Sequence, residues 1–157
     1  MAAAEFGATI GPFGKASAIV PVTYKIDADK RTVRTKCVGF VTLREVIDHF
    51  RTLDQDCERP DLLDVLLDLS EVESLPETHQ ISAVITEMKR IQIRLRFGAC
   101  AIVANRDALL GMMRIFEALG EECFRVTCTF RAVREAEAWL VAQRSLTAED
   151  DLGAHGA

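Results

Sequence analysis

The sequence predicts a single α/β domain whose mixed sheet has about five strands, with elements in the order ββαβαβαβα. Two segments, LLDVLLDLS (62–70) and FGACAIVA (97–104), are nearly continuously apolar over the length of a strand. Such segments are typical of central parallel strands that are covered on both faces. Segments with the 3.6-residue apolar repeat of amphipathic helices stand between the strands. The 157 residues are enough to bury one sizeable core.

The first two strands are expected to form a β-hairpin. Apolar and polar residues alternate through VTYKIDADKRTVRTKCVGF (22–40), on both sides of the turn sequence DADK (27–30). Alternation of this kind indicates strands with one face open to water, so the hairpin is expected at one side of the sheet. A helix follows in TLREVIDHFRTL (42–53), where Thr42 and Glu45 have the spacing of a capping box.

Two further helices and an edge strand follow along the chain. The helix between the two apolar strands has one apolar face, made by Ile81, Val84, Ile85, Met88 and Ile91. In the next helix, Asn105 is placed to cap the start and Gly120 to end it. FRVTCTF (124–130) alternates and is expected near a sheet edge, and VREAEAWLVAQ (133–143) is expected to be the last helix. Connections between parallel strands are expected to cross over right-handedly.

The two ends of the chain differ in composition from this core. Residues 1–18 are rich in alanine and glycine and have no usable periodicity, which predicts an N-terminal arm. Residues 145–157 are acidic and contain glycine, which predicts a frayed C-terminal tail. The α/β domain is therefore expected to span residues 19–144, and no internal repeat divides it.

The composition argues against several classes of protein. A formal net charge of −5 disfavours a general nucleic-acid binder, which normally shows a basic face. No apolar run reaches the roughly 20 residues of a transmembrane segment, and the first residues lack the basic region of a secretory signal. A cytoplasmic protein is therefore expected. The five cysteines form no C-x-x-C pair and have no histidine at metal-ligand spacing, so reduced thiols and no metal site are expected.

No set of residues indicates catalysis. The sequence contains no glycine-rich nucleotide-binding motif, no nucleophile elbow and no zinc-protease motif. His49 and His79 have no ligand-type neighbours at a recognisable spacing, and both are expected at the surface. We therefore expect no enzyme activity, no catalytic residues and no cofactor.

The loop after the first apolar strand is the first candidate site. Ligands and partners of α/β sheets favour loops at the carboxyl ends of strands, and SEVESLPETH (70–79) is such a loop. Its candidate recognition residues are Ser70, Ser74, Glu77, Thr78 and His79. The N–H groups at the start of the following helix offer a place for an anion. Alternatively, the loop is a plain connection, because Pro76 and Glu77 are typical of a first helical turn.

This segment resembles the STAS domains of bacterial anti-sigma-factor antagonists. Their pattern is roughly D-L-S-x-V-x-x-x-D-S-S-G after a strand, and a serine at the helix start is phosphorylated by a partner kinase. The matching positions are Asp68, Leu69, Ser70 and Val72. The differing positions are Pro76 for the aspartate, Glu77 and Thr78 for the two serines, and His79 for the glycine. The resemblance therefore implies a regulatory interaction module without the serine switch, because glutamate cannot be phosphorylated.

A second resemblance covers residues 97–140. The strand Gly-Ala-x-Ala-Ile-Val-Ala, the helix Gly-Met-x-Arg-Ile-Phe-Glu, and Phe130-Arg131 ahead of Trp139-Leu140 are similar to the carboxyl half of the SpoIIAA-like proteins. This bacterial family of STAS-like domains is related in shape to Sec14-type lipid-transfer folds. With the hairpin and the first apolar strand, the likeness covers most of residues 20–143, and it implies a fold more than an activity.

The helix over residues 109–119 is the second candidate site. Met112, Met113 and Phe116 are suited to line an adaptable apolar pocket or a partner interface, since methionine repacks easily. Their helical spacing is also that of ordinary core residues. Gly111 costs about 1 kcal/mol relative to alanine in a helix, so close approach of a strand or a second subunit is expected there.

Two functions remain open from the sequence. The first is a non-enzymatic, regulatory protein-interaction module of the STAS type, with an unknown protein partner and a homodimer as one alternative. The second is a carrier of a lipid or another small apolar ligand. A carrier predicts a closed, methionine-lined cavity of roughly 300 Å³ or more. An interaction module predicts a filled core and an exposed apolar patch.

Overall fold

The computed structural model describes residues 20–155, which form one five-stranded sheet and four helices. The elements in chain order are β1 (Val22–Asp27), β2 (Thr32–Gly39), α2 (Leu43–Gln55), β3 (Leu62–Val72), α3 (Thr78–Ile91), β4 (Arg96–Val103), α4 (Asp107–Leu119), β5 (Val126–Phe130) and α5 (Val133–His155). The arm predicted for residues 1–18 lies outside the described residues.

The strands lie in the order β1-β2-β3-β4-β5. β1 pairs with β2 in the antiparallel sense, and every other neighbouring pair is parallel. The two apolar segments form β3 and β4 and run side by side in the same direction, with Val65 opposite Cys100. The predicted α/β fold is therefore confirmed in its mixed five-stranded sheet, its hairpin at one side and its parallel apolar strands.

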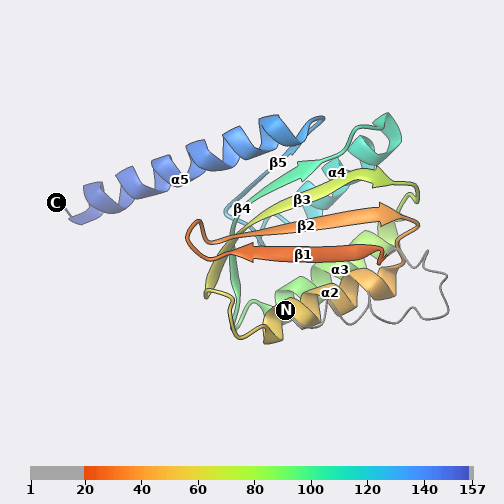
Figure 1. The fold of residues 1–157 in the computed structure, drawn as a ribbon, viewed down its shortest axis with the longest axis horizontal. Coiled ribbons are helices and arrows are strands. Elements are labelled where there is room, and N and C mark those ends of the chain that lie inside the picture. Colours follow the sequence, from red (N-terminus) through yellow and green to blue (C-terminus); the bar gives the residue numbers. More distant parts are fainter. Residues whose placement is uncertain (1–19, 156–157) are drawn as a thin grey trace, which may run out of the picture.

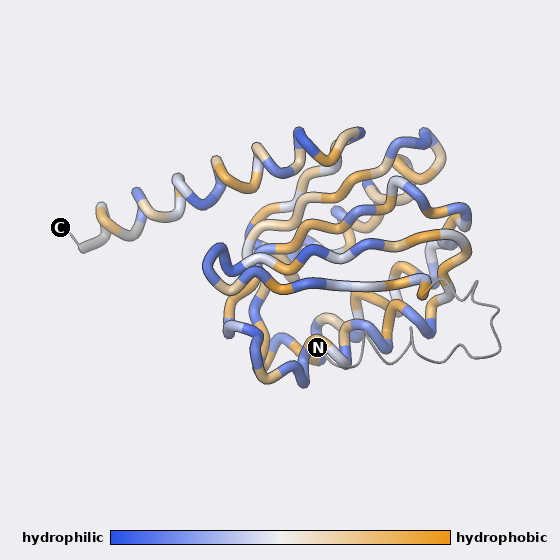
Figure 2. Tube along the Cα trace, viewed as in Figure 1, coloured by the Kyte–Doolittle hydropathy of each residue, from blue (hydrophilic) through white to orange (hydrophobic). Residues whose placement is uncertain are grey.

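Helices cover the two faces of the sheet unequally (Figure 1). α2, α3 and α4 pack beside one another on one face. α5 lies on the other face over β3, β4 and β5, and its C-terminal half extends beyond the sheet. The turn between β1 and β2 is hydrophilic, whereas β3 and β4 are mostly hydrophobic (Figure 2). On the face that α5 covers, the β1–β2 hairpin is therefore the part of the sheet that this helix does not cover.

β4 contributes to the core on both faces, because successive side chains of a strand point to opposite sides. Cys100 and Ile102 pack on the side of α2, α3 and α4. Ala99 and Ala101 face α5, where they are buried with Ala136 and other residues of that helix. Small side chains on both elements leave room for α5 to lie close to the strand. A separate, smaller core results on this face.

A local sequence signal sets the start of α2 but not that of α4. At the start of α2, the Glu45 N–H donates to Thr42 Oγ1 (3.2 Å) and the Thr42 N–H donates to Glu45 Oε2 (2.8 Å). This is the predicted capping box, which is therefore confirmed. α4 begins at Asp107 with Arg106 at the N-cap, one residue later than the cap expected at Asn105.

Two glycines of α4 have different surroundings. Gly120 ends the helix as predicted, but its φ of −101° lies outside the left-handed region. A Cβ at this position would lie 2.8 Å from Ile85 Cδ1, so the glycine lets α4 end against α3. At Gly111, an added Cβ would meet nothing within 4 Å among the described residues. Within residues 20–155, therefore, no strand or helix makes the close approach that we expected at Gly111.

α5 is longer than the sequence predicts. It continues into the segment for which we expected a frayed tail (145–157), and is helical as far as His155. The segment has no proline, and Gly153 is the first glycine after the start of α5. Helix-forming residues therefore carry the last helix well past the edge of the sheet.

Candidate ligand pocket at the carboxyl edge of the sheet

The carboxyl ends of β2 and β3 lie next to each other, with Gly39 opposite Val72. Each strand leads into a helix, β2 into α2 and β3 into α3. Ser74 joins the two connections, because the Val41 N–H donates to Ser74 Oγ (3.1 Å). Arg106, at the start of α4, donates to the Ser74 carbonyl (3.0 Å). Three strand-to-helix connections therefore meet at the edge where the sequence places the recognition loop.

A pocket of about 460 Å³ lies at this edge, between the sheet and the helices α2 and α3. Its apolar lining comes from β1, β2, β3, the loops that follow β2 and β3, and all three helices of that face: Val22, Cys37, Phe40, Val41, Leu43, Val46, Phe50, Leu67, Leu69, Val72, Leu75, Pro76, Ile81, Val84, Leu109, Met113 and Phe116. The volume lies in the range of small-molecule sites, roughly 300–1,000 Å³. We refer to this site as the carboxyl-edge pocket.

Two of the five candidate loop residues line this pocket, namely Ser74 and Glu77. Thr78 and His79 are exposed at the start of α3 and do not line it. His79 Nδ1 lies 3.2 Å from Glu77 Oε2. Ser70 is half-buried, and its hydroxyl donates to the carboxylate two residues earlier at 2.6 Å. The loop is thus both a connection between elements and part of the pocket mouth.

The candidate residues of α4 are divided in the same way. Met113 and Phe116 are buried and line the carboxyl-edge pocket. Met112 is half-buried and packs against the same core without lining the pocket. The closed, methionine-lined cavity predicted for a carrier is therefore not found: the pocket opens to solvent, and Met113 is the one methionine among its described lining residues. Branched aliphatic and aromatic side chains make up most of its wall.

The prediction of a surface position for His49 is wrong, and this residue is the main polar group of the pocket that the sequence reasoning missed. Its side chain is 9% exposed and lines the pocket. Its Nε2 lies 3.2 Å from Oγ1 of Thr35, which is 3% exposed. Burial lowers the pKa of His49 to about 4, so the imidazole is neutral at pH 7. Its helical spacing could have indicated this burial, because Val46 lies three residues before it and Leu53 four residues after it on the same apolar face.

The thiol that lines the pocket is protonated. Burial raises the pKa of Cys37 to about 12, with smaller contributions from the nearby carboxylates of Asp68 and Glu45. A thiol in that state is a poor nucleophile at neutral pH. All five cysteines of the chain are free. In the described part of the chain, no group of three or more His, Cys, Asp or Glu residues is placed to hold a metal ion.

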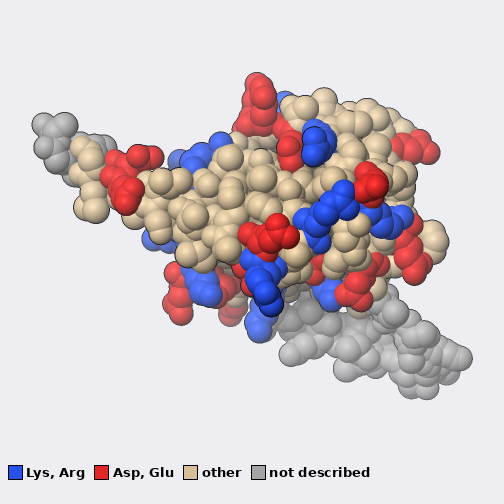
Figure 3. Space-filling model, turned by 90° about the horizontal axis from the view of Figure 1, so that it is seen from above, with Lys and Arg blue, Asp and Glu red and all other residues tan. Residues whose placement is uncertain are grey.

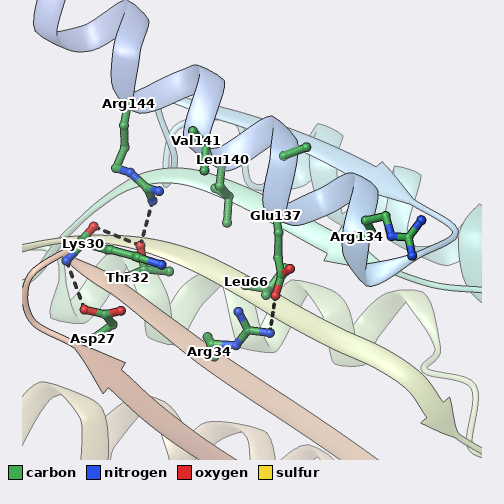
Figure 4. A pocket seen from close by; sticks show the side chains of 11 residues that line it. Asp27, Lys30, Thr32, Arg34, Leu66, Arg134, Glu137, Leu140, Val141 and Arg144 are labelled. Atoms are coloured by element: carbon green, nitrogen blue, oxygen red, sulfur yellow. Dashed lines mark hydrogen bonds and ion pairs between the residues drawn. The ribbon is translucent and has the colours of Figure 1, made fainter.

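A second hollow lies on the other face of the sheet, between α5 and the β1–β2 hairpin (Figure 4). This groove of about 340 Å³ has an apolar floor that includes Leu66 and Leu140. An ion pair between Arg34 Nη2 and Glu137 Oε1 (2.5 Å) crosses it, and Arg144 Nη1 donates to Thr32 Oγ1 (3.2 Å). Seen from above, charged side chains of both signs lie on this side of the molecule (Figure 3). We refer to this hollow as the α5 groove.

No protein-family model matches the sequence, and no curated protein matches it either. Within residues 20–155, no helix has both the length and the apolar character that a bilayer crossing requires. The carboxyl-edge pocket therefore has to be interpreted from its own lining, volume and charge.

Proposed function

We propose that the protein binds a small apolar molecule in the carboxyl-edge pocket. The observation that carries this proposal is an apolar-lined space of about 460 Å³ at the carboxyl ends of parallel strands. In open α/β sheets, this edge is the usual place for ligands. Most of the lining is apolar and only a few side chains are polar, which is the usual composition of a small-molecule site.

The energetics favour an apolar occupant over water. Each Å² of apolar surface removed from water contributes about 25 cal/mol to binding. Water in such a cavity needs about two to four hydrogen-bonding partners. Most of this wall is hydrocarbon, so it offers water few such partners. A hydrocarbon chain or a ring system, by contrast, restores the packing contacts that an empty cavity lacks.

Filling the pocket with a side chain tests the proposal. Leu67 is half-buried on β3 and lines the pocket, so Leu67→Trp is expected to occupy part of the space. We expect saturable binding of the neutral dye Nile red by the wild type, and binding weakened roughly tenfold or more by this variant. Val46→Phe, on α2, provides a second filling variant.

Ile93→Trp is the matched control, because Ile93 is 90% exposed and lies outside the pocket. It adds the same indole ring to the protein and should leave the dye affinity unchanged. Wild-type protein that shows no saturable binding, or equal loss of binding in Leu67→Trp and Ile93→Trp, would contradict the proposal. Native mass spectrometry of the purified protein provides an independent check for a ligand that co-purifies.

A second candidate function is a STAS-type or SpoIIAA-like regulatory interaction module that acts through the same edge. Phe40 and Leu75 support it, because their side chains are 72% and 47% exposed beside the pocket mouth. Exposed apolar side chains that gather near one another are typical of protein-binding surfaces. The position of Glu77 at the start of α3 leaves this module without the serine switch of the STAS pattern. A bacterial, cytoplasmic setting belongs to the same proposal, and the free cysteines fit a reducing compartment.

Affinity capture from the native host tests this second function. A genuine partner should be retained by the wild type and by Ile93→Ser, but lost with the double variant Phe40→Ser and Leu75→Ser. A partner that binds all three proteins equally would place the interaction elsewhere. Sedimentation of the wild type over a range of concentrations measures whether a homodimer forms. For a dimer through α5, the exposed Leu146 and Leu152 provide the residues to replace.

A further inference from the structure

The polar groups of the carboxyl-edge pocket indicate what kind of apolar molecule it takes. Building on the proposed ligand-binding function, we propose that the ligand is uncharged and carries a hydroxyl or carbonyl group, which hydrogen-bonds to the His49–Thr35 pair. His49 comes from α2 and Thr35 from β2, and both line the pocket.

The geometry of the pair leaves it able to bind a ligand. His49 Nε2 and Thr35 Oγ1 are 3.2 Å apart, and both side chains are more than nine-tenths buried. A neutral imidazole has one donor and one acceptor nitrogen, and a hydroxyl has one donor and two acceptor positions. Among the described residues, the contact with Thr35 is the one side-chain hydrogen bond of His49. The pair therefore keeps hydrogen-bonding capacity for a group that enters the pocket.

The charges around the pocket disfavour an anionic ligand. In the described part of the chain, no lysine or arginine is among the lining residues, and Glu77 is the acidic one. A carboxylate or phosphate moved into this space would lose its hydration without gaining a cation as partner. The neutral imidazole of His49 does not supply the missing charge.

The starts of α2 and α3 offer an anion little compensation for the missing cation. Helix N-termini ordinarily attract anions through their free N–H groups. At α2, the N–H groups of Thr42 and Glu45 are paired with each other's side chains. At α3, the Glu77 N–H donates to Gln80 Oε1 (2.9 Å). The Glu45 carboxylate thus already lies at the start of α2, and the negative charge of Glu77 at the N-cap of α3 repels a ligand anion there.

Three probes with one ring system test the inference: naphthalene, 2-naphthol and 2-naphthoate at pH 7, each titrated by NMR or calorimetry. We expect 2-naphthol to bind about fivefold tighter than naphthalene, the gain of one net hydrogen bond. The ionised 2-naphthoate is expected to bind weakest. In the Thr35→Val and His49→Phe variants, the affinity for 2-naphthol should fall to that for naphthalene, which itself should change little.

Matched variants separate this effect from a general loss of structure. Thr23→Val removes a hydroxyl from the exposed face of β1 and should leave all three affinities unchanged. Thr35→Ser keeps the hydroxyl and should keep the preference for 2-naphthol. Unfolding midpoints of all variants show whether each one is folded.

The outcomes distinguish the inference from the function on which it rests. Equal or tighter binding of 2-naphthoate, or a 2-naphthol preference that survives both Thr35→Val and His49→Phe, overturns the inference alone. Binding of Nile red without any preference among the three probes also overturns it alone. If neither Nile red nor any of the three probes binds, the proposed function and this inference fall together.

Discussion

The carboxyl-edge pocket and the α5 groove lie on opposite faces of one sheet and differ in what fills them. Their volumes are comparable, about 460 Å³ and 340 Å³. The pocket is walled mainly by hydrocarbon, whereas the groove has an ion pair across it and four cationic side chains in its lining. Water and paired charges can occupy the groove at little cost, because the polar groups there remain near solvent. The mainly apolar wall of the pocket offers water and charges few partners, which is why we assign the ligand to it.

The side chains that the central strands present to their two faces differ in size. Towards α5, Ala99 and Ala101 let the helix pack closely on β4. Towards α2, α3 and α4, the same strand presents the larger Cys100 and Ile102. α5 and β4 therefore enclose a small, closely packed core, whereas the larger core on the other face borders the carboxyl-edge pocket.

The largest expected effect is a difference in stability between alanine variants of two neighbouring residues in the larger core. Leu67 and Ile102 lie opposite each other on β3 and β4, but Ile102 is completely buried and Leu67 lines the pocket. We expect Ile102→Ala to lower the free energy of unfolding by about 4 kcal/mol and Leu67→Ala by about 1–2 kcal/mol, because the second site already lacks some contacts. Urea denaturation measures both values. Equal losses would show that the pocket is as well packed as the core.

The next effect is a pH dependence that originates in the pocket. The pKa of His49 is about 4 in the folded chain, whereas an unperturbed histidine, as in the unfolded chain, has a pKa of 6.5. As the pH falls, the unfolded chain therefore takes up a proton before the folded chain does. Stability should therefore decrease from pH 6.5 to pH 4, by roughly 3 kcal/mol in total. His49→Phe should flatten this part of the curve.

The carboxylate of Glu87 titrates at lower pH than His49, so its effect on stability can be separated from that of the imidazole. The Arg90 guanidinium, assisted by that of Arg51, lowers the pKa of Glu87 to about 2. Its contribution to stability is lost only as the pH falls from 4.5 towards 2. A wild type and a His49→Phe variant with the same slope between pH 6.5 and 4.5 would contradict the burial of a neutral imidazole.

A smaller effect is expected from the polar contact that closes one end of the α5 groove. Arg144→Met keeps most of the apolar stem but removes the hydrogen bond to Thr32, which is buried. The free energy of unfolding should fall by about 1 kcal/mol. The affinity of the carboxyl-edge pocket for Nile red should remain unchanged, because the two hollows share no lining residue. A change in dye affinity would mean that the two faces are coupled.

The smallest effect is expected from the ion pair that crosses the groove. Arg34 and Glu137 are both about half exposed, so solvent screens their attraction. Glu137→Gln should lower the free energy of unfolding by less than about 0.5 kcal/mol, and the difference should shrink as salt is added. A loss above 2 kcal/mol in thermal or urea unfolding would show that the pair is a structural element of the groove.

Predictions from the sequence succeeded where a signal is local or repetitive. The apolar segments 62–70 and 97–104 were predicted to be central strands and form β3 and β4. They could be identified because a strand covered on both faces has to be apolar throughout. The capping box at Thr42 depends on residues three apart, so it too could be read directly. The length of α5 was underestimated, since the acidic and glycine residues of 145–157 were interpreted as fraying although the segment also contains the helix formers leucine, alanine and glutamate.

Predictions of the site were less complete because a pocket belongs to several elements at once. Four of the predicted site residues line the pocket: Ser74 and Glu77 from the loop after β3, and Met113 and Phe116 from α4. His49 was missed although its helical position is apolar, because an isolated histidine carries no sign of its partner on β2. The size of the cavity cannot be read from any one segment.

By itself, the order of apolar, polar and turn-forming residues determined the class of fold, the direction of the central strands and most helix boundaries. Only the tertiary structure decided that a space of about 460 Å³ remains beneath α2 and α3, and that a neutral His49 faces it. The physical reason is that backbone conformation follows from neighbours along the chain. Packing volume and burial follow from side chains that are distant in sequence and meet only in the folded state.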